Sequence, residues 1–271
     1  LTLNTARAVK HAFDLESRGA LEIKGKAEPV EAFRAVARKT TPESARGIAG
    51  LDSPLVGRDR ELKTLQSCVD ELAQGRGQIV SVMGDAGLGK SRLAAELRKQ
   101  YSVSSDQYSK VNLKSEIENL KWLEGRSLSY DISTPYAPFI DLFNRLYHLT
   151  DDASDVEKYA RISKSTKGLA ENHLEIAPFI ATMLGIKLQG EDYEAIRYIE
   201  PPQLRGKIFQ AVFHFFEHLA RRQPLILQFE DLHWADSVSL DLLEQLMRLP
   251  GGAPVMILAL FRPQKHDPSW R

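Results

Sequence analysis

The sequence predicts a three-layer α/β fold in which a parallel β-sheet lies between two layers of helices. Residues 78–83 are a short, β-branched apolar run, which leads through a glycine-rich turn into the strong helix formers of residues 91–99. Residues 225–229 are a second apolar run, and two acidic residues follow it directly. Short apolar runs of this kind, separated by helical segments, are typical of a buried parallel sheet.

The glycine-rich turn has the composition of a phosphate-binding loop. Residues 84–91 read GDAGLGKS, an unbroken G-x-x-x-x-G-K-S. Glycines let successive backbone N–H groups turn inward, and the N-terminus of the following helix adds its positive end. Lys90 is predicted to reach the β- and γ-phosphates of a nucleotide, and the Ser91 hydroxyl to hold Mg²⁺. The alternative is a glycine-rich turn ahead of an ordinary helix, but the strand and helix on either side favour the phosphate site.

An acidic pair, Glu230 and Asp231, ends the second apolar run. Open α/β sheets bind ligands at the carboxyl ends of their parallel strands. Beside a phosphate loop, one acid can hold the Mg²⁺ water shell and the other can orient the attacking water. Alone, such a pair is more often a helix N-cap or a solvated turn. Together with the loop, it predicts hydrolysis of a nucleotide rather than passive binding.

These motifs resemble the AAA-type ATPase module of the STAND signalling NTPases. Within that group, the chain is most similar to the module that is joined to class III nucleotidyl cyclase domains in large bacterial regulators. The resemblance covers residues 53–271, with motifs in the right order, and it implies a P-loop NTPase that binds Mg·ATP. The matching segments are VGRDREL at 56–62, GDAGLGKSRL at 84–93, WLEGR at 122–126, PYAPF at 135–139, LILQFEDLHWAD at 225–236, and the strand at 255–261 with the Arg-Pro that follows it.

The resemblance implies a role for each matching position. Glu230 would hold Mg²⁺ together with Ser91, and Asp231 would act on the attacking water. Because many P-loop enzymes have Asp at the first acid, the division of labour between the two acids stays open. The phosphates would be bound by nine consecutive residues: Gly84, Asp85, Ala86, Gly87, Leu88, Gly89, Lys90, Ser91 and Arg92. The catalytic set would be Lys90, Glu230, Asp231 and Arg262, the last of these contacting the γ-phosphate.

The resemblance also places a nucleoside-binding segment before the loop. Val56, Gly57 and Arg58 would lie near the adenine and ribose. Arg58 is alternatively a surface residue of a capped turn, and Arg262 is alternatively the end of a strand. In the segment after the acids, we expect Trp234 to be a packed aromatic side chain, His233 to be a hydrogen-bonded histidine, and Asp236 to cap a helix. A catalytic role for His233 and Trp234 is the alternative.

The first 38 residues form a separate region. Alternating residues 19–23, a Lys-Gly turn and residues 29–36 predict a β-hairpin. It resembles the C-terminal hairpin of a class III cyclase domain, whose catalytic residues would lie upstream, so we expect no cyclisation by this chain alone. Lys24 and Lys26 would approach a triphosphate only in a complete cyclase and are otherwise solvated hairpin lysines. The predicted organisation is a cyclase tail at 1–38, a linker at 39–52 and an ATPase core at 53–271, without its last strand and its lid and therefore slow in turnover.

Between the motifs, we expect further elements of the α/β fold. Residues 100–121 are predicted to be a variable helix or loop, and residues 127–130 the second strand of the sheet. Residues 139–148 and 169–188 are predicted to be helical. Residues 204–220 predict an amphipathic helix, since its apolar residues fall at intervals of three and four. That apolar stripe is expected to lie in the core: Ile208, Val212, Phe215, Phe216 and Leu219.

Composition limits the partners. Lys plus Arg equals Asp plus Glu at 36 each, so no global field attracts nucleic acid or an anionic membrane. The single cysteine, Cys68, excludes an internal disulfide and suits a cytoplasmic protein, and the longest apolar run, 255–261, is far below a membrane span.

Expected partners are ATP, an upstream cyclase domain and downstream protein-binding repeats of the same polypeptide, with a homo-oligomer also open. The alternatives to a switch ATPase are the regulatory part of a cyclase and a nucleotide-dependent scaffold with negligible turnover. A GTPase is disfavoured because no Asn-Lys-x-Asp motif follows the loop.

Overall fold

The computed structural model describes residues 1–2, 5–6, 13–21, 29–38, 55–101, 120–128, 134–169 and 176–263. The chain divides into two compact units, Leu1–Pro54 and Leu55–Arg271, each of which is described by itself. Several of the sequence predictions lie outside the described residues: the Lys-Gly turn with the roles of Lys24 and Lys26, the linker at 39–52, the conformation of residues 102–119, and residues 129–130 of the predicted second strand.

The first unit is built on a two-stranded antiparallel sheet. Strand β1 (Phe13–Leu21) pairs with β2 (Val30–Arg38), so that Phe13 lies opposite Arg38 and Leu21 opposite Val30. The start of the chain runs along β2, where the backbone of Phe33 exchanges hydrogen bonds of 2.8 Å with that of Leu1 in both directions. The predicted antiparallel hairpin is therefore confirmed as a structure.

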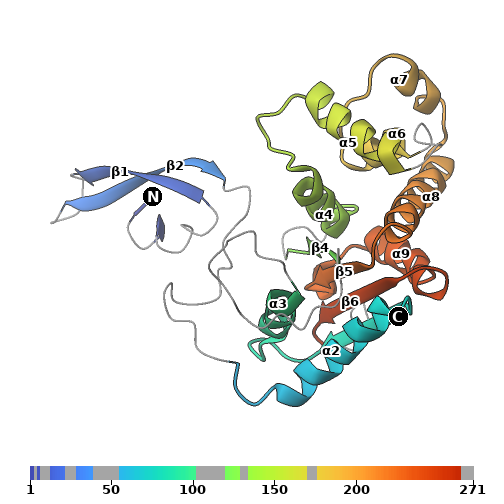
Figure 1. Ribbon diagram of the computed structural model, residues 1–271. Coiled ribbons are helices and arrows are strands. Elements are labelled where there is room, and N and C mark those ends of the chain that lie inside the picture. Colours follow the sequence, from blue (N-terminus) through green and yellow to red (C-terminus); the bar gives the residue numbers. More distant parts are fainter. Residues whose placement is uncertain are drawn as a thin grey trace. The chain divides into compact units, whose positions relative to one another are not determined.

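The second unit contains a four-stranded, fully parallel sheet (Figure 1). Its strands are β3 (Gln78–Met83), β4 (Lys121–Arg126), β5 (Leu225–Glu230) and β6 (Val255–Phe261), in the spatial order β3-β6-β5-β4. All of β5 and nearly all of β6 are buried, as strands covered on both faces must be.

Helices cover both faces of this sheet. On one face, α2 (Asp59–Ala73) and α3 (Lys90–Tyr101) pack against the even-numbered side chains of the central strands, such as Ile226 and Leu258. On the other face, α4 (Ala137–Tyr147), α8 (Pro201–Ala220) and α9 (Ser237–Leu246) pack against the odd-numbered ones. Alternate side chains of a strand point to opposite faces, so each central strand contributes to both cores. The prediction of a three-layer α/β fold is confirmed.

The second face carries the larger core, which is rich in aromatic rings. The ring of Phe143 in α4 lies 5.3 Å from that of Phe215 and 5.6 Å from that of Phe216 in α8. All five residues of the apolar stripe predicted for α8 are buried, which confirms its orientation. Further helices and short 3-10 turns complete the unit: α5 (Asp155–Leu169), α6 (Ala177–Met183), α7 (Gly190–Ile196), η2 (Leu232–Trp234) and η3 (Leu249–Gly251).

The second strand along this unit lies earlier than predicted. It covers Lys121–Arg126 and ends before residue 127, and Arg126 pairs opposite Glu230. The strand is at the edge of the sheet, and only Leu123 and Gly125 are buried. Glu124 and Arg126 are two residues apart on the other face and pair with each other at 3.1 Å.

The single helix predicted for residues 169–188 is also wrong. Within the described part of that range, α6 ends at Met183. Gly185 has a φ of +71°, which L-residues rarely adopt, and its N–H donates to Thr182 O. The next N–H, that of Ile186, donates to Ala181 O at 3.0 Å. This pair of bonds is a Schellman motif, which satisfies the last carbonyls of the helix and ends it.

Replacing Gly125 with alanine should destabilise the second unit. A Cβ at this position would lie 2.2 Å from the backbone oxygen of Pro138, at the start of α4. Because the obstacle is backbone, we expect Gly125→Ala to lower the free energy of unfolding by about 3 kcal/mol, as in strong overpacking.

Gly206→Ala is the control. It lies inside α8, where an added Cβ would meet no atom within 4 Å, and it should stabilise by about 0.5–1 kcal/mol. Urea unfolding of both variants measures the difference, and equal stability would contradict the close approach of β4 to α4.

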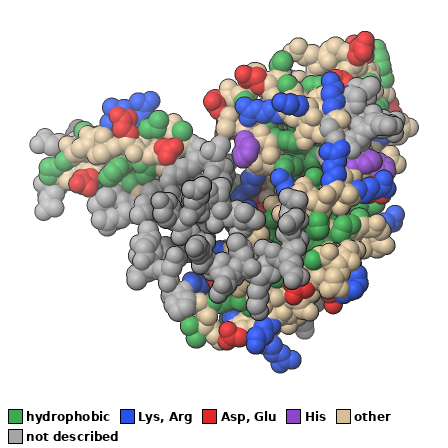
Figure 2. Space-filling model, in the orientation of Figure 1, with side chains coloured by type: hydrophobic (Ala, Val, Ile, Leu, Met, Phe, Trp, Pro, Cys, Tyr) green, Lys and Arg blue, Asp and Glu red, His purple; other side chains and the backbone are tan. Residues whose placement is uncertain are grey.

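Charges are mixed on the surface. On the face drawn in Figure 2, the Lys and Arg side chains are interspersed with Asp and Glu. None of the helices that the structure describes combines the length and the apolar character that a membrane crossing requires.

Candidate functional site

The parallel strands deliver their functional segments to one edge of the sheet. In the register of the sheet, Met83 at the end of β3 lies opposite Phe261 at the end of β6, and Arg126 lies opposite Glu230. The glycine-rich loop and the acidic pair therefore both lie at the carboxyl ends of the parallel strands, which form this edge of the sheet. This is the edge at which parallel α/β sheets bind their ligands.

The glycine-rich loop is closed around the Lys90 ammonium. Lys90 Nζ donates to the carbonyl oxygens of Gly84 at 2.6 Å and Asp85 at 3.0 Å. Gly87 and Gly89 have φ values of +81° and +79°, a left-handed conformation that suits glycine. Because α3 begins at Lys90, the positive end of the helix dipole lies at the loop. The loop thus combines a lysine ammonium with the positive end of a helix.

The segment before α2 lies beside this loop. Arg58 donates through Nη2 to the carbonyl oxygen of Leu88 at 3.3 Å and pairs through Nη1 with Glu61 at 2.6 Å. The bond to Arg58 lowers the pKa of Glu61. The predicted nucleoside-binding residues are thereby brought next to the predicted phosphate-binding ones. Val56, two residues earlier, is 81% exposed, and Leu88 is 50% exposed. Two apolar side chains are therefore open to a ligand near the loop.

Glu230 is the buried acid of the site. Its Oε1 accepts a hydrogen bond of 2.9 Å from Gln228 Nε2, and its Oε2 pairs with Arg126 Nη2 at 3.0 Å. Burial raises the pKa of Glu230, while Arg126 and a hydrogen bond with Ser91 act in the opposite direction. The contact with Ser91 joins the end of the glycine-rich loop to the end of β5.

Sequence reasoning missed Arg126 as a residue of this site. Its Nη2 also pairs with Glu124 Oε1 at 3.1 Å, and its backbone N–H donates to Asp141 Oδ2 at 3.0 Å. Burial opposes the charge of Arg126, but Glu230, Glu124 and Asp141 outweigh it and raise the pKa of the guanidinium. The WLEGR segment contained the only signal, an arginine at the end of a strand.

Asp231 makes a sharp turn directly after β5. Its φ of +53° is left-handed, a conformation in which Asp and Asn are enriched among residues with a side chain. Its carbonyl oxygen accepts the N–H of Trp234 at 2.9 Å, which closes η2. The charge of Asp231 contributes to raising the pKa of both Glu230 and Arg126.

The residues after the acids form η2 and lead into α9. His233 is buried, and its ring centroid lies 5.0 Å from that of Trp234. Asp236 caps α9, accepting the backbone N–H of Ser239 at 3.0 Å, which confirms the predicted N-cap.

Arg262 follows β6 directly, at the same edge of the sheet as the loop and the acids. Its side chain is half-buried, and its Nε is a buried donor without a hydrogen-bond partner. Arg262, the predicted γ-phosphate contact, thus follows the strand that lies between β3, which leads into the loop, and β5, which ends in the acids.

The oxygen donors of this site fit Mg²⁺. Ser91 contributes a hydroxyl and Glu230 a carboxylate, which are hard ligands of the kind that Mg²⁺ takes. Within the described ranges, no cluster of three or more His, Cys, Asp or Glu residues is placed to hold a metal. Mg²⁺ sites of nucleotide-binding proteins need no such cluster, because water and phosphate fill the remaining positions.

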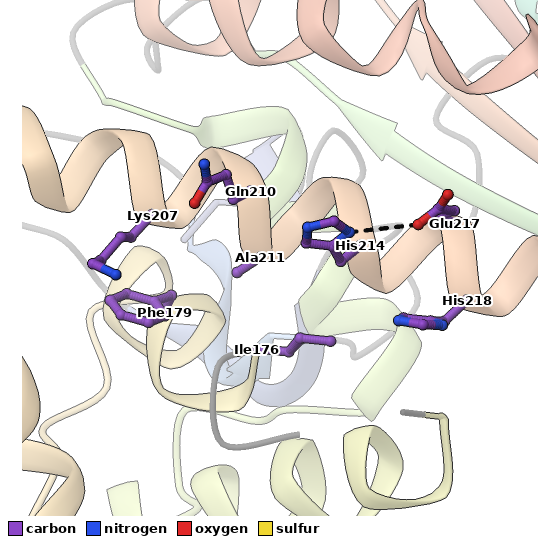
Figure 3. A pocket seen from close by; sticks show the side chains of 8 residues that line it. All are labelled: Ile176, Phe179, Lys207, Gln210, Ala211, His214, Glu217 and His218. Carbon is purple, nitrogen blue, oxygen red and sulfur yellow. Dashed lines mark hydrogen bonds and ion pairs between the residues drawn. The ribbon is translucent and has the colours of Figure 1, made fainter. Parts of the chain in front are cut away.

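A separate hollow of about 430 Å³ lies between α6 and α8 (Figure 3). Its lining includes Phe179 of α6 and Lys207, His214 and His218 of α8. None of its lining residues belongs to the glycine-rich loop or to the carboxyl ends of the strands. This hollow is therefore distinct from the site described above.

The parallel sheet, the phosphate loop after β3 and the acids after β5 define a P-loop nucleotide-binding protein. A family model described as the AAA ATPase domain matches residues 54–258, which is more than half of the chain. The chain belongs to this AAA ATPase domain family. Because the match begins at residue 54, the similarity of residues 1–38 to a cyclase tail stays a prediction.

The chain is also similar to a longer bacterial protein. It is 26% identical over 246 residues to the uncharacterized protein R02095 of Rhizobium meliloti (strain 1021). The matched region covers 91% of this chain and 22% of that relative. The chain thus spans about a fifth of the length of the curated relative it matches.

Proposed function

We propose that this chain binds Mg·ATP at the carboxyl edge of its parallel sheet, hydrolyses it slowly, and acts as a nucleotide-state switch in a larger regulatory protein. The observation that carries the proposal is the glycine-rich loop closed around the Lys90 ammonium at the end of β3, at the same edge of the sheet as the buried carboxylate of Glu230. Ser91 and Glu230 are oxygen ligands of the kind that suits Mg²⁺.

The phosphates bind on the loop and on the first turn of α3. Lys90 exchanges its two carbonyl partners, on Gly84 and Asp85, for phosphate oxygens. A charged acceptor makes a stronger bond with an ammonium group than a carbonyl does, so the exchange favours the nucleotide. The base lies on the exposed apolar surface of Val56 and Leu88.

The two acids divide the remaining work. Glu230 is fixed by Gln228 and lies against Ser91, so it holds the Mg²⁺ side. Asp231 stands on a turn that leaves the sheet and is only partly buried, so it orients the attacking water. Mg²⁺, when bound, supplies charge neutralisation between the phosphates. Arg262, at the end of β6, adds positive charge on the γ-phosphate side.

Calorimetric titration of the 271-residue chain tests this proposal directly. We expect ATP to bind in the presence of Mg²⁺ and to bind more weakly when EDTA removes it, with GTP weaker than ATP. Glu230→Gln should remove most of this Mg²⁺ dependence, because a neutral amide is a poorer Mg²⁺ ligand than a carboxylate. Gln78→Ala, at the opposite end of the sheet, is the control and should keep it. Absence of ATP binding, or an unchanged Mg²⁺ dependence in Glu230→Gln, would contradict the assignment.

Turnover separates a switch from a scaffold. A slow release of phosphate under single-turnover conditions supports the switch, because hydrolysis then limits the lifetime of the ATP state. Stable binding without any phosphate release would favour a nucleotide-dependent scaffold instead.

A further inference from the structure

The Arg126 guanidinium lies beside the Glu230 carboxylate, which is the Mg²⁺ ligand in the proposed function. Its Nη2 lies 3.0 Å from Glu230 Oε2, and the Glu230 side chain is only 4% exposed. A buried carboxylate needs a cation or several hydrogen bonds, and Arg126 supplies the cation here. The positive charge beside Glu230 is therefore part of the protein itself.

The same guanidinium has a second carboxylate within reach. Arg126 Nη2 is 3.1 Å from Glu124 Oε1, almost the same distance as from Glu230. One nitrogen is shared by two acids, while the buried Nε has no hydrogen-bond partner. A bidentate arginine–carboxylate pair would use two nitrogens on one acid. The Nη2 of Arg126 is thus shared between Glu230 and Glu124.

Glu124 connects this arginine to two helices. Its Oε2 pairs with Arg98 Nη1 of α3 at 3.2 Å, and its Oε1 lies 3.8 Å from Arg145 Nη1 of α4. Helix α3 is the helix that follows the phosphate loop. A change in the pairing of Arg126 therefore alters the charge balance at a carboxylate that touches α3 and α4.

We propose that Arg126 is an exchangeable internal cation, which is shared by Glu230 and Glu124 when the site is free and leaves Glu230 for Glu124 alone when Mg·ATP binds. This inference rests on the proposed function, because it requires Glu230 to be the Mg²⁺ carboxylate. Two cations cannot share one buried carboxylate without repulsion, so Arg126 and Mg²⁺ compete for Glu230. Arg126 thereby sets the Mg²⁺ concentration that ATP binding requires. Its transfer to Glu124 couples nucleotide binding to α3 and α4, whose arginines pair with Glu124.

Two variants should shift the Mg²⁺ requirement in opposite directions. Arg126→Gln removes the competing cation, so the Mg²⁺ concentration for half-maximal ATP binding should fall by about tenfold, the worth of one hydrogen bond to a charged group. Glu124→Gln removes the alternative partner, so Arg126 should stay on Glu230 and the requirement should rise severalfold. A residue that only stabilises the fold would not produce opposite signs.

Arg145→Gln is the matched control. Arg145 approaches Glu124 at 3.8 Å, as Arg126 does at 3.1 Å, and its side chain pairs with Asp141, but among the described residues it is paired with neither acid of the site. Its Mg²⁺ requirement should change by less than about twofold, as expected for a partly exposed ion pair. Glu124→Gln leaves both Arg126 and Glu230 in place, so the experiment stands even where Arg126→Gln does not fold.

The measurement is the binding of a fluorescent ATP analogue to the 271-residue chain across a Mg²⁺ titration, with no turnover required. Shifts of opposite sign in Arg126→Gln and Glu124→Gln support the exchange. Parent-like Mg²⁺ requirements in both folded variants, or shifts of the same sign, would overturn it while leaving ATP binding itself intact. Failure of the parent chain to bind the analogue would overturn the proposed function together with the exchange.

Discussion

Lys90→Ala is expected to weaken ATP binding by about a hundredfold or more, because two charge-assisted hydrogen bonds of about 1.5–3 kcal/mol each are lost. Lys90 is the lysine that the loop encloses, with its ammonium held by Gly84 O and Asp85 O. These two carbonyls belong to a loop that is largely open to solvent, so water can replace the lysine there. The fold should therefore survive the substitution.

Lys99→Ala is the control for this prediction. Lys99 lies in the last turn of the same helix and makes a 3.8 Å ion pair with Glu96 on the surface. Its removal should change ATP affinity by less than about twofold, because exposed ion pairs contribute little. Calorimetry measures the affinities, and circular dichroism verifies the fold. Undiminished ATP affinity in folded Lys90→Ala would remove the basis of the phosphate-loop assignment.

Asp231→Asn is expected to leave ATP bound and to slow its hydrolysis by about a hundredfold or more, the usual contribution of a positioned acid–base group. An amide cannot polarise water as a carboxylate does. The substitution isolates this chemistry well, because Asn adopts the left-handed backbone of position 231 as readily as Asp. The turn into η2 should therefore stay intact.

Asp236→Ala is the matched control for the second acid. It removes the N-cap of α9 and should reduce the free energy of unfolding by about 1 kcal/mol without slowing hydrolysis. Single-turnover phosphate release, compared among the parent and the two variants, gives the answer. Hydrolysis by Asp231→Asn at the parent rate would show that another group orients the water.

Local patterns predicted the elements whose determinants lie close together in the chain. The apolar spacing of α8 placed Phe215 and Phe216 in the core, and Asp236 was predicted to be an N-cap; the structure confirms both. The errors came where a local signal was weak or was overlooked. Gly185 ends α6, but the apolar residues on both sides of it suggested a continuous helix. Strand β4 was predicted at residues 127–130 but covers Lys121–Arg126, where the charged residues pair with arginines of other elements.

The sequence by itself determined the phosphate loop, because its glycines, its lysine and its serine form one continuous segment followed by a helix. Only the tertiary structure decided that β6 lies between β3 and β5, and that Arg126 lies opposite Glu230. Those relations depend on which strands pair and in which register, and pairing is decided by the packing of segments that are distant in the chain. A charged residue in an edge strand therefore shows its partner only after the sheet has formed.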